Sequence, residues 1–493
     1  MELFISAVAL FGLVIIVASL LSGAVERSGV PLVAAFLALG AALGPWGLGL
    51  VDVEFHSPAL HALSVLGLAL VLFSDAVTIE AGELRSHRRL LWRLLGPGTL
   101  VPAVLIALAA RALLGVSWAA AAILGGALAS TDPVLLRSIL RAPALPGPVR
   151  VALRIESGMN DVVLLPVVVL AMLALRPGGA AGGDVARSVV GLFILGPVLG
   201  ALVGWVGIRL LARVRTTVGV RRDYESLYAL GLAFTGFAAA EGVGGSGFLA
   251  AFAAGLMVGS QDVELCDCFL EYGEATAEML LLLTFVALGT SLIWTGLPLL
   301  DVRTLLFTAV ALVVRTAVLY PVLAATGVTK RERQLIALFG PRGLSTLLLM
   351  LLPVFAGIPG AERLFSVAAL VVLFSVVLHG TGIAIFLRAH AAPRAPAPAA
   401  PVPSPAAAVA PPETVPAAEA TAEEVAPLIT LQEMRALQER GEPVVIVDAR
   451  AGRNYRADDQ QAAGAVRVAP EDPVRDATAL RLSQRATLVV YCA

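Results

Sequence analysis

Long uninterrupted runs of apolar residues, rather than an alternation of apolar and polar ones, make up most of this chain. A run of about 20 apolar residues is long enough to cross a bilayer as a helix. We expect the first run to be a retained span and not a signal peptide, because it has no basic start and no clear cleavage site. The runs predict thirteen membrane-spanning helices, near residues 2–22, 31–51, 57–79, 90–114, 117–140, 151–175, 185–212, 225–241, 245–260, 276–296, 302–326, 332–357 and 361–388.

The composition agrees with a membrane protein. Of the 493 residues, 58% are hydrophobic and 14% are charged, with a mean hydropathy of +0.88, whereas soluble domains carry about 25% charged residues. These values exclude a wholly soluble protein, and they exclude disorder over most of the chain. A net charge of −1 gives no basic field, so we expect no nucleic-acid partner. Three cysteines exclude a disulfide framework.

The basic residues predict the orientation in the membrane. An odd number of spans places the two termini on opposite sides. If the C-terminus is cytoplasmic, the outer loops hold only Arg111, Arg176, Arg187, Arg303 and Arg363, and the other arginines and the lysine between spans lie inside. The positive-inside rule therefore predicts an outer N-terminus and a cytoplasmic C-terminus.

The composition changes after the last predicted span. The next residues contain ten of the thirty prolines, mostly alternating with alanine, which is typical of an extended linker. Further on, the pattern predicts an amphipathic helix over Leu431–Arg440 and buried strands over Val444–Val447 and Thr487–Tyr491. The predicted domains are a transmembrane part over 1–390, the linker over 391–427 and a small α/β part over 428–493.

Two predicted spans contain helix breakers in their middle, at Ala129–Pro133 and at Gly340–Gly343. Proline removes a backbone donor, and freed backbone groups at membrane depth must be buried in protein or line a cavity. These spans are the fifth and the twelfth, so they cross in opposite directions. This predicts two inverted repeats of six spans, joined by the seventh, with a site near the midplane. A pair of ordinary proline kinks is the alternative.

The sixth span carries two carboxylates near its start, Glu156 and Asp161, which are costly in a membrane helix. Ser157 and Asp161 are four residues apart and share a face, and Glu156 and Asn160 share the neighbouring face. Asp161 can therefore present its carboxylate to a cavity. For Glu156 a simple pairing at the membrane interface, with Arg150 or Arg154, remains open.

A carboxylate in a water-accessible cavity can bind either a proton or a small cation, each excluding the other. Hard cations prefer oxygen ligands, which Thr131, Ser157 and the freed carbonyls around residue 130 could supply. Competition at one carboxylate, combined with alternating access, gives ion–proton exchange. A channel is the less natural alternative.

Several motifs resemble those of the monovalent cation:proton antiporters of the sodium/hydrogen exchanger family. They are Thr131-Asp132-Pro133, Glu156–Asp161, Gly245–Gly255, Phe285–Gly289 and Gly340–Leu344, in the family's order. The resemblance covers about residues 1–390. It implies an all-α polytopic membrane protein with crossed broken helices, a homodimer, and a transporter rather than an enzyme, with no cofactor.

The resemblance also implies roles for the residues of the ion site. Asp161 resembles the carboxylate that alternately binds cation and proton, and Thr131 and Ser157 resemble further ligands of the metal cation. Asn160 matches the Asn-Asp version of the motif, which implies electroneutral exchange. One departure is Val162, where family members usually have a small residue.

Other family residues imply structural roles. Asp132 matches the position at the crossing of the broken helices, where it would offset helix dipoles. Glu156 and Arg342 resemble a structural ion pair with Asn160 attached. Asp75 falls near an acidic position of some members, and Arg315 resembles another family arginine, or pairs structurally or snorkels.

The tail resembles a rhodanese-like domain. Val445–Arg450 matches its first strand motif, Gly464-Ala465-Val466 resembles a later step without the usual histidine, and Val489–Cys492 matches the strand before the sulfur-carrying cysteine. The loop that would follow Cys492 is missing, so we expect a partial domain without sulfurtransferase activity.

The expected function is exchange of Na⁺ or Li⁺ for protons across the cytoplasmic membrane, for pH and sodium homeostasis. The partners are these cations, protons and the lipid bilayer. K⁺/H⁺ exchange is the nearest alternative, and a membrane-anchored sulfurtransferase-like protein is a more distant one. His379, in the last span, is a further candidate for hydrogen bonding across helices.

Overall fold

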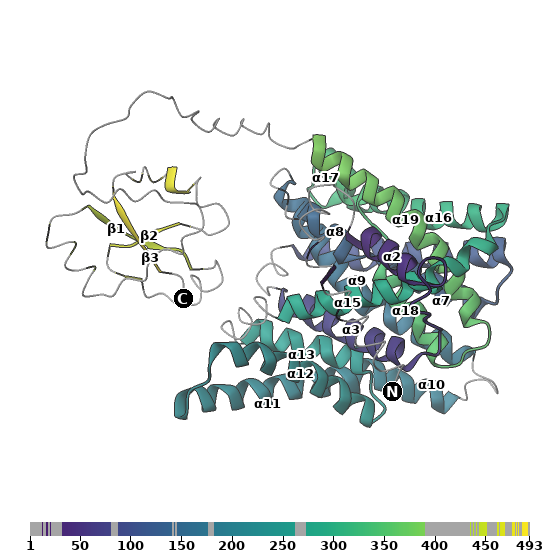
Figure 1. The fold of residues 1–493 in the computed structure, drawn as a ribbon, viewed down its shortest axis with the longest axis horizontal. Helices are drawn as coiled ribbons and strands as arrows, with labels where there is room; N and C mark the ends of the chain where they lie inside the picture. The colour runs from purple at the N-terminus through teal and green to yellow at the C-terminus, as the bar shows by residue number, and fades with distance from the viewer. Residues whose placement is uncertain are drawn as a thin grey trace, which may run out of the picture. The chain divides into compact units, whose positions relative to one another are not determined.

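The computed structural model describes most of the chain in two compact units, Met1–Pro393 and Arg394–Ala493. The described residues are 32–79, 87–140, 145–175, 182–261, 273–389 and 443–450, parts of 461–468 and 476–491, and isolated residues elsewhere. The first unit is a bundle of helices and the second contains a small sheet (Figure 1).

The helical unit is made of long helices and of shorter ones that follow each other at breaks. The helices are α2 (Leu32–Leu43), α3 (Pro58–Val77), α5 (Arg88–Leu95), α6 (Pro97–Ala109), α7 (Trp118–Ala129), α8 (Pro133–Leu140), α9 (Gly147–Ala174), α10 (Gly182–Val190), α11 (Gly196–Thr217), α12 (Arg222–Gly242), α13 (Gly247–Gln261), α15 (Glu274–Thr290), α16 (Val302–Val322), α17 (Lys330–Leu338), α18 (Leu344–Phe355) and α19 (Ala361–Ala389). One-turn π segments, Ala110–Leu114 and Gly191–Leu195, extend α6 and join α10 to α11, and 3₁₀ turns at Leu292–Leu299 and Leu323–Ala325 follow α15 and α16.

The predicted apolar runs from 31–51 onward all contain helices, and the first, near 2–22, lies almost wholly outside the described residues. Among the described residues, seven helical segments are long and apolar enough to cross a membrane, and the bent pair Met279–Thr290 and Leu292–Leu299 would make eight. Three shorter apolar helices, α2, α13 and α18, accompany them. The molecule is therefore a mostly helical membrane protein, while the number of thirteen spans stays a prediction.

Both predicted breaks are present, and local chemistry explains where each half-helix begins. Pro133 opens α8 at a position where its missing N–H costs nothing. Gly343 precedes α18 with backbone angles outside the helical and extended regions, φ −154° and ψ −130°. α17 starts with a capping box, in which Glu332 N–H donates to the Thr329 hydroxyl and Thr329 N–H to the Glu332 carboxylate.

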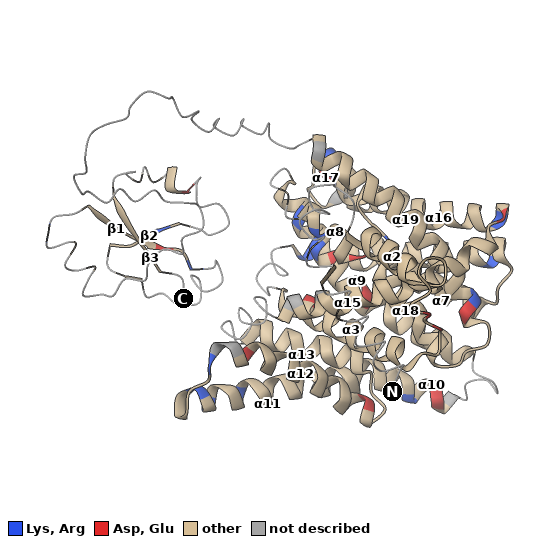
Figure 2. Ribbon diagram, in the orientation of Figure 1, with Lys and Arg blue, Asp and Glu red and all other residues tan. Residues whose placement is uncertain are grey.

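Side chains on the outside of the bundle match a lipid environment. Figure 2 shows that most of the helical unit carries no charge and that arginines gather at helix ends. In the segment Gly183–Thr217, which includes α11, and in α16, only 28% of the most apolar window is buried inside the protein. The exposed side chains there are large and apolar: Val198, Leu202, Trp205, Leu210, Leu305, Leu306 and Val313. Exposed apolar faces of this length need lipid to cover them.

α13 packs between α3 and α11, and Figure 1 shows α11, α12 and α13 lying along one another. A Cβ atom built at Gly255 of α13 would overlap the carbonyl oxygen of Phe73 on α3. Membrane helices approach this closely only where a small residue meets a neighbouring backbone. This contact fixes α13 against α3. Helix α3 shares one hydrophobic core with the broken helices.

The second unit contains a parallel sheet in the order β2-β1-β3, made of β1 (Val444–Asp448), β2 (Val466–Arg467) and β3 (Thr487–Tyr491). Both strands expected from the sequence are thus present. The buried carboxylate of Asp448 accepts from Arg450 Nη2 at 2.8 Å and from the Tyr491 hydroxyl at 2.9 Å, and the Arg450 hydrogen bonds lower the pKa of Asp448 to about 2. The predicted helix and linker lie almost wholly outside the described residues.

The close approach of α13 to α3 at Gly255 can be tested by comparing a glycine-to-alanine substitution there with the same substitution at Gly231. Gly255→Ala should lower the unfolding temperature of the purified protein, because the added methyl overlaps the backbone of α3. Gly231→Ala, on an exposed face of α12 with nothing near its Cβ, should leave it unchanged or raise it, since alanine is favoured over glycine in a helix by about 1 kcal/mol. Thermal unfolding in detergent measures both. Equal effects at the two sites would contradict the close approach.

Candidate functional site

The two breaks meet in the middle of the helical unit. The backbone N–H of Asp132 donates to the carbonyl oxygen of Pro341 at 3.0 Å. α7 packs against α18 on one side of this bond. Four half-helix ends therefore lie at one place: the C-terminal ends of α7 and α17, and the N-terminal ends of α8 and α18. Each end leaves unpaired backbone groups and a partial charge.

The carboxylate of Asp132 accepts hydrogen bonds from both N-terminal ends. Asp132, which is 1% exposed, accepts from Val134 N–H at the start of α8 at 2.7 Å and, through its other oxygen, from Leu344 N–H at the start of α18. A Cβ atom at Gly343 would overlap that second oxygen, so only glycine allows this approach. Asp132 lies where the sequence placed it, at the crossing, with its negative charge on two positive helix ends.

Two guanidinium groups, those of Arg342 and Arg315, donate hydrogen bonds to the C-terminal ends. Arg342 Nη1 donates to the carbonyl oxygens of Ala129 and Ser130 at the end of α7, both at 2.9 Å. Arg315 donates to Ala337 and Ile336 at the end of α17, at 2.9 and 3.1 Å. Every half-helix end at the crossing thus faces a buried side chain of opposite charge.

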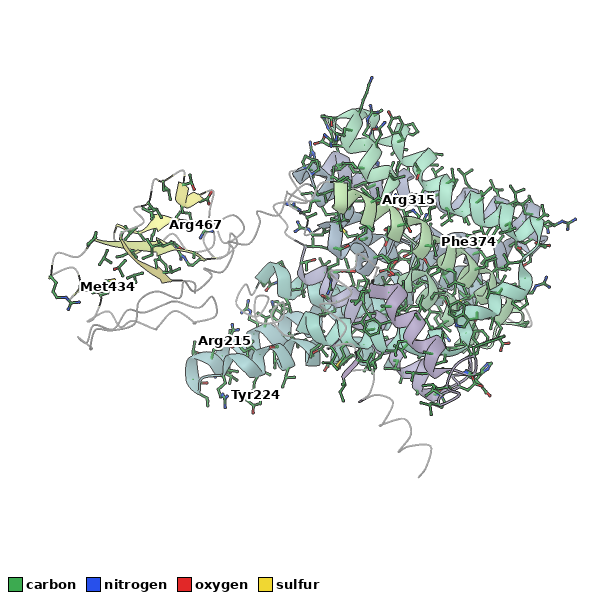
Figure 3. The ribbon with its side chains drawn as sticks, turned by 45° about the horizontal axis from the view of Figure 1, so that its top comes forward. Arg215, Tyr224, Arg315, Phe374, Met434 and Arg467 are labelled. Carbon is green, nitrogen blue, oxygen red and sulfur yellow. The ribbon has the colours of Figure 1, made fainter. Side chains whose placement is uncertain are left out.

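The structural ion pair differs from the one expected. Glu156 forms a bidentate pair with Arg315, at 2.8 Å to Nε and 2.7 Å to Nη2, and not with Arg342. The reason is that Arg342 directs its guanidinium to the end of α7, while Arg315 reaches Glu156 from α16. Figure 3 labels Arg315 within the helical unit. Neither interface pairing nor snorkelling describes these two residues, because both are 3% exposed.

Asp161 lies within hydrogen-bonding distance of the crossing. One of its carboxylate oxygens accepts from the Ser130 hydroxyl, and the neighbouring Asn160 donates to the Thr131 hydroxyl at 2.7 Å. Asp161 is 2% exposed and Asn160 1%. The contact of Ser130 with Asp161 was not predicted from the sequence. The break contains two adjacent hydroxyls, those of Ser130 and Thr131, and their spacing alone does not say which one contacts the carboxylate.

Two oxygens of this group are buried and unsatisfied. Among the described residues, neither Asp161 Oδ2 nor Asn160 Oδ1 has a hydrogen-bond partner. A buried polar atom without a partner calls for an explanation, since it costs about 1–3 kcal/mol. Carboxylate, amide and hydroxyl oxygens together form the donor set that a hard cation prefers. The arrangement fits a small cation better than a hydrogen-bonded core.

Ser157 and Asp75 are placed beside this group rather than in it. The Ser157 hydroxyl donates to the Arg154 carbonyl of its own helix at 3.3 Å. Both residues line a cavity of about 280 Å³ between α3, α8, α9 and α15. Asp75 also packs against Gly158. The cavity reaches α9 one helical turn before Asp161, so it is a candidate access route to the carboxylate.

The remaining expected positions give no site. Cys492 lies outside the described residues. In the part of the chain that the structure describes, no group of three or more His, Cys, Asp or Glu side chains is close enough to hold a metal. A monovalent cation bound through one carboxylate and several hydroxyls would not form such a group.

The pairing of Glu156 can be tested by double-mutant cycles. Removing one partner of a buried pair costs about 3–5 kcal/mol, so Glu156→Gln and Arg315→Met should each strongly lower the unfolding temperature. The double variant should lose less than the sum, with a coupling of about 0.5–3 kcal/mol. A cycle of Glu156→Gln with Arg342→Met should show a smaller coupling, and the reverse order of the two couplings would refute the observed pairing.

Comparison with known proteins identifies the family. A family model described as sodium/hydrogen exchanger, transmembrane, matches residues 13–389. The K(+)/H(+) antiporter NhaP2 of Shewanella sp. (strain ANA-3) is 29% identical over 380 residues, covering 74% of this chain and 64% of that protein. The K(+)/H(+) antiporter NhaP of Alkalimonas amylolytica is 28% identical, with 75% and 64% covered. The match therefore spans 64% of the length of these relatives, which is less than two thirds.

The fold comparison agrees. The sodium proton antiporter MjNhaP1 from Methanocaldococcus jannaschii, solved at pH 8, has a TM-score of 0.65 and 19% sequence identity, and the match covers 78% of this chain and 99% of that one. At this identity the likeness shows the fold alone. The family model covers well over half of the chain, and the chain therefore belongs to the sodium/hydrogen exchanger family.

Proposed function

We propose that this protein exchanges a monovalent cation for a proton across the cytoplasmic membrane, with Asp161 binding the two in turn. The observation that carries the proposal is the buried pair of unsatisfied oxygens, on Asp161 and Asn160, beside the Ser130 and Thr131 hydroxyls. Na⁺ or Li⁺ is the proposed cation. K⁺ is the second candidate, because the relatives at 28% and 29% identity are named K(+)/H(+) antiporters.

The buried charges support one-for-one exchange. Around the crossing, three carboxylates are buried, those of Asp132, Glu156 and Asp161, and two guanidinium groups, those of Arg315 and Arg342. With all five ionised the group carries one excess negative charge. Leaving such a charge uncompensated in a low-dielectric interior is costly, so one proton or one monovalent cation neutralises the site. The exchange is then electroneutral.

In the proposed transport cycle the two broken helices, one from each inverted repeat, move together as one body, with the cavity beside Ser157 as the inner access route. The N-terminus lies outside and the C-terminus in the cytoplasm, as the loop charges predict. We further propose a homodimer in the membrane. In this cycle Asp161 loses its proton to one side before it binds the cation, and the Ser130 and Thr131 hydroxyls supply ligand oxygens.

The C-terminal unit is proposed to be rhodanese-like and to lie on the cytoplasmic side. Its parallel strands β1 and β3 contain most of two of the three motifs that suggested the resemblance. A protein that used its spans only as an anchor for this domain would have no need of five buried charges in the membrane part. We therefore place transport before a sulfurtransferase-like role.

The transport proposal is tested in liposomes with an inside-acid pH gradient and an enclosed pH dye. Sodium, lithium, potassium and choline are added in turn. Wild-type protein should dissipate the gradient with at least one alkali cation and not with choline. Asp161→Asn should reduce the rate to that of empty vesicles, because the amide cannot exchange a proton for a cation, while the protein remains folded.

A matched control for this test is Asp301→Asn. Asp301 caps α16 outside the span, and asparagine caps equally well, so this variant should transport as the wild type does. Transport by Asp161→Asn at the wild-type rate would sink the proposal, and a response to potassium alone would assign K⁺ as the cation.

The charge count has its own test, with the same vesicles adsorbed on a sensor for membrane currents. A sudden increase in the transported cation should give no sustained current beyond that of Asp161→Asn vesicles, although the pH dye reports exchange. The physical reason is that the site carries one monovalent positive ion, either the cation or the proton, in each direction across the membrane. A sustained current that accompanies exchange would show unequal stoichiometry.

A further inference from the structure

The break Gly340–Gly343 is held from two sides. Without helical hydrogen bonds its polar groups need partners elsewhere in the protein. On one side Pro341 accepts from the backbone of Asp132. On the other side Arg342 N–H donates to the Ser375 hydroxyl of α19 at 2.6 Å. Ser375 is fully buried, so the last helix is a direct support of the break.

Ser375 is itself oriented by a histidine. His379 lies one turn further along α19, and its Nδ1 is 3.0 Å from the Ser375 hydroxyl oxygen. A hydroxyl has one proton to donate and two lone pairs that accept. Because Ser375 accepts from Arg342 N–H, its own proton is free to go to His379 Nδ1. His379 Nδ1 is also 3.2 Å from the Ser375 carbonyl oxygen, so the ring contacts both polar groups of this serine. In the neutral form with Nδ1 as acceptor, the ring takes the hydroxyl proton and turns a Ser375 lone pair toward the break.

The same arginine connects this support to the proposed ion site. While its backbone is held by Ser375, its side chain donates to the carbonyl oxygens of Ala129 and Ser130. The hydroxyl of Ser130 in turn donates to Asp161. Hydrogen bonds thus connect His379 to the Ser375 hydroxyl and this hydroxyl to the Arg342 backbone. The Arg342 side chain is bonded to the Ser130 carbonyl, and the Ser130 hydroxyl to the Asp161 carboxylate. His379 itself has no hydrogen bond to the carboxylate or to the break.

We propose that His379, acting through Ser375, is a positioning residue that sets the cation affinity of the Asp161 site. The inference rests on the proposed function. Its physical content is that the acceptor on His379 fixes the Ser375 hydroxyl, which fixes the backbone of Arg342, which places Ser130 against Asp161. Loss of the acceptor frees the hydroxyl to turn away from Arg342 N–H, and the ligand hydroxyl is then held less well.

The test uses the full chain in liposomes and measures initial exchange rate against cation concentration. His379→Leu, which removes the acceptor, and Ser375→Ala, which removes the hydroxyl, should each raise the half-saturating concentration about fivefold, the scale of one lost hydrogen bond, with the maximal rate kept within about twofold. His379→Asn restores an acceptor near the position of Nδ1 and should return the half-saturating concentration toward the wild-type value.

The matched control is Ser366→Ala. Ser366 is also a buried serine of α19, but its hydroxyl bonds to Thr295 at 2.8 Å, away from the break. This variant should keep the wild-type half-saturating concentration. Thermal unfolding without added cation, measured on all four variants, separates a loss of affinity from a loss of folded protein.

The outcomes separate this inference from the proposed function. A wild type that exchanges no cation overturns the proposed function and the inference with it. A wild type that exchanges, together with unchanged half-saturation in His379→Leu and Ser375→Ala, overturns the inference alone. It is also overturned if His379→Asn behaves as His379→Leu does, or if Ser366→Ala shifts by the same factor, because a general packing role predicts both.

Discussion

The helical unit depends on one constraint: two helices are interrupted inside the membrane, and their four free ends must be satisfied without water. The chain meets this constraint with charged side chains. Asp132 accepts from the first N–H groups of α8 and α18, and Arg342 and Arg315 donate to the last carbonyls of α7 and α17. Each charge stabilises a helix end, and the opposite partial charge of that end stabilises the buried side chain in return.

This arrangement links the stability of the fold to the chemistry of the site. Arg315 and Arg342 both bind helix ends, and the carboxylate partner of Arg315 is Glu156. Among the described residues, the carboxylate of Asp161 therefore forms no ion pair with a guanidinium group. Its compensation is a hydroxyl from Ser130, which carries no charge. The uncompensated negative charge is therefore confined to one group, and that group is the one beside unsatisfied oxygens.

Much of the helical pattern and the crossing could be predicted from the sequence, because both follow from local signals. Apolar runs of membrane length predicted helices, and Pro133 and Gly340–Gly343 marked both breaks. The partner of Glu156 could not be predicted, since Arg315 and Arg342 carry the same group and only the packing of α16 against α17 decides between them. For the same reason the contact of Ser130, rather than Thr131, with Asp161 was missed.

The contacts at the crossing also limit how the molecule can move. Asp132 is bound through its backbone to Pro341 and through its side chain to the start of α18, so neither break can shift without the other. Arg342 adds bonds from the second break to the end of α7 and to Ser375 on α19. A change that exposes Asp161 to the other side must therefore carry both broken helices together. In the proposed cycle the two broken helices then move as one body, and the close contact at Gly255 holds α13 against α3.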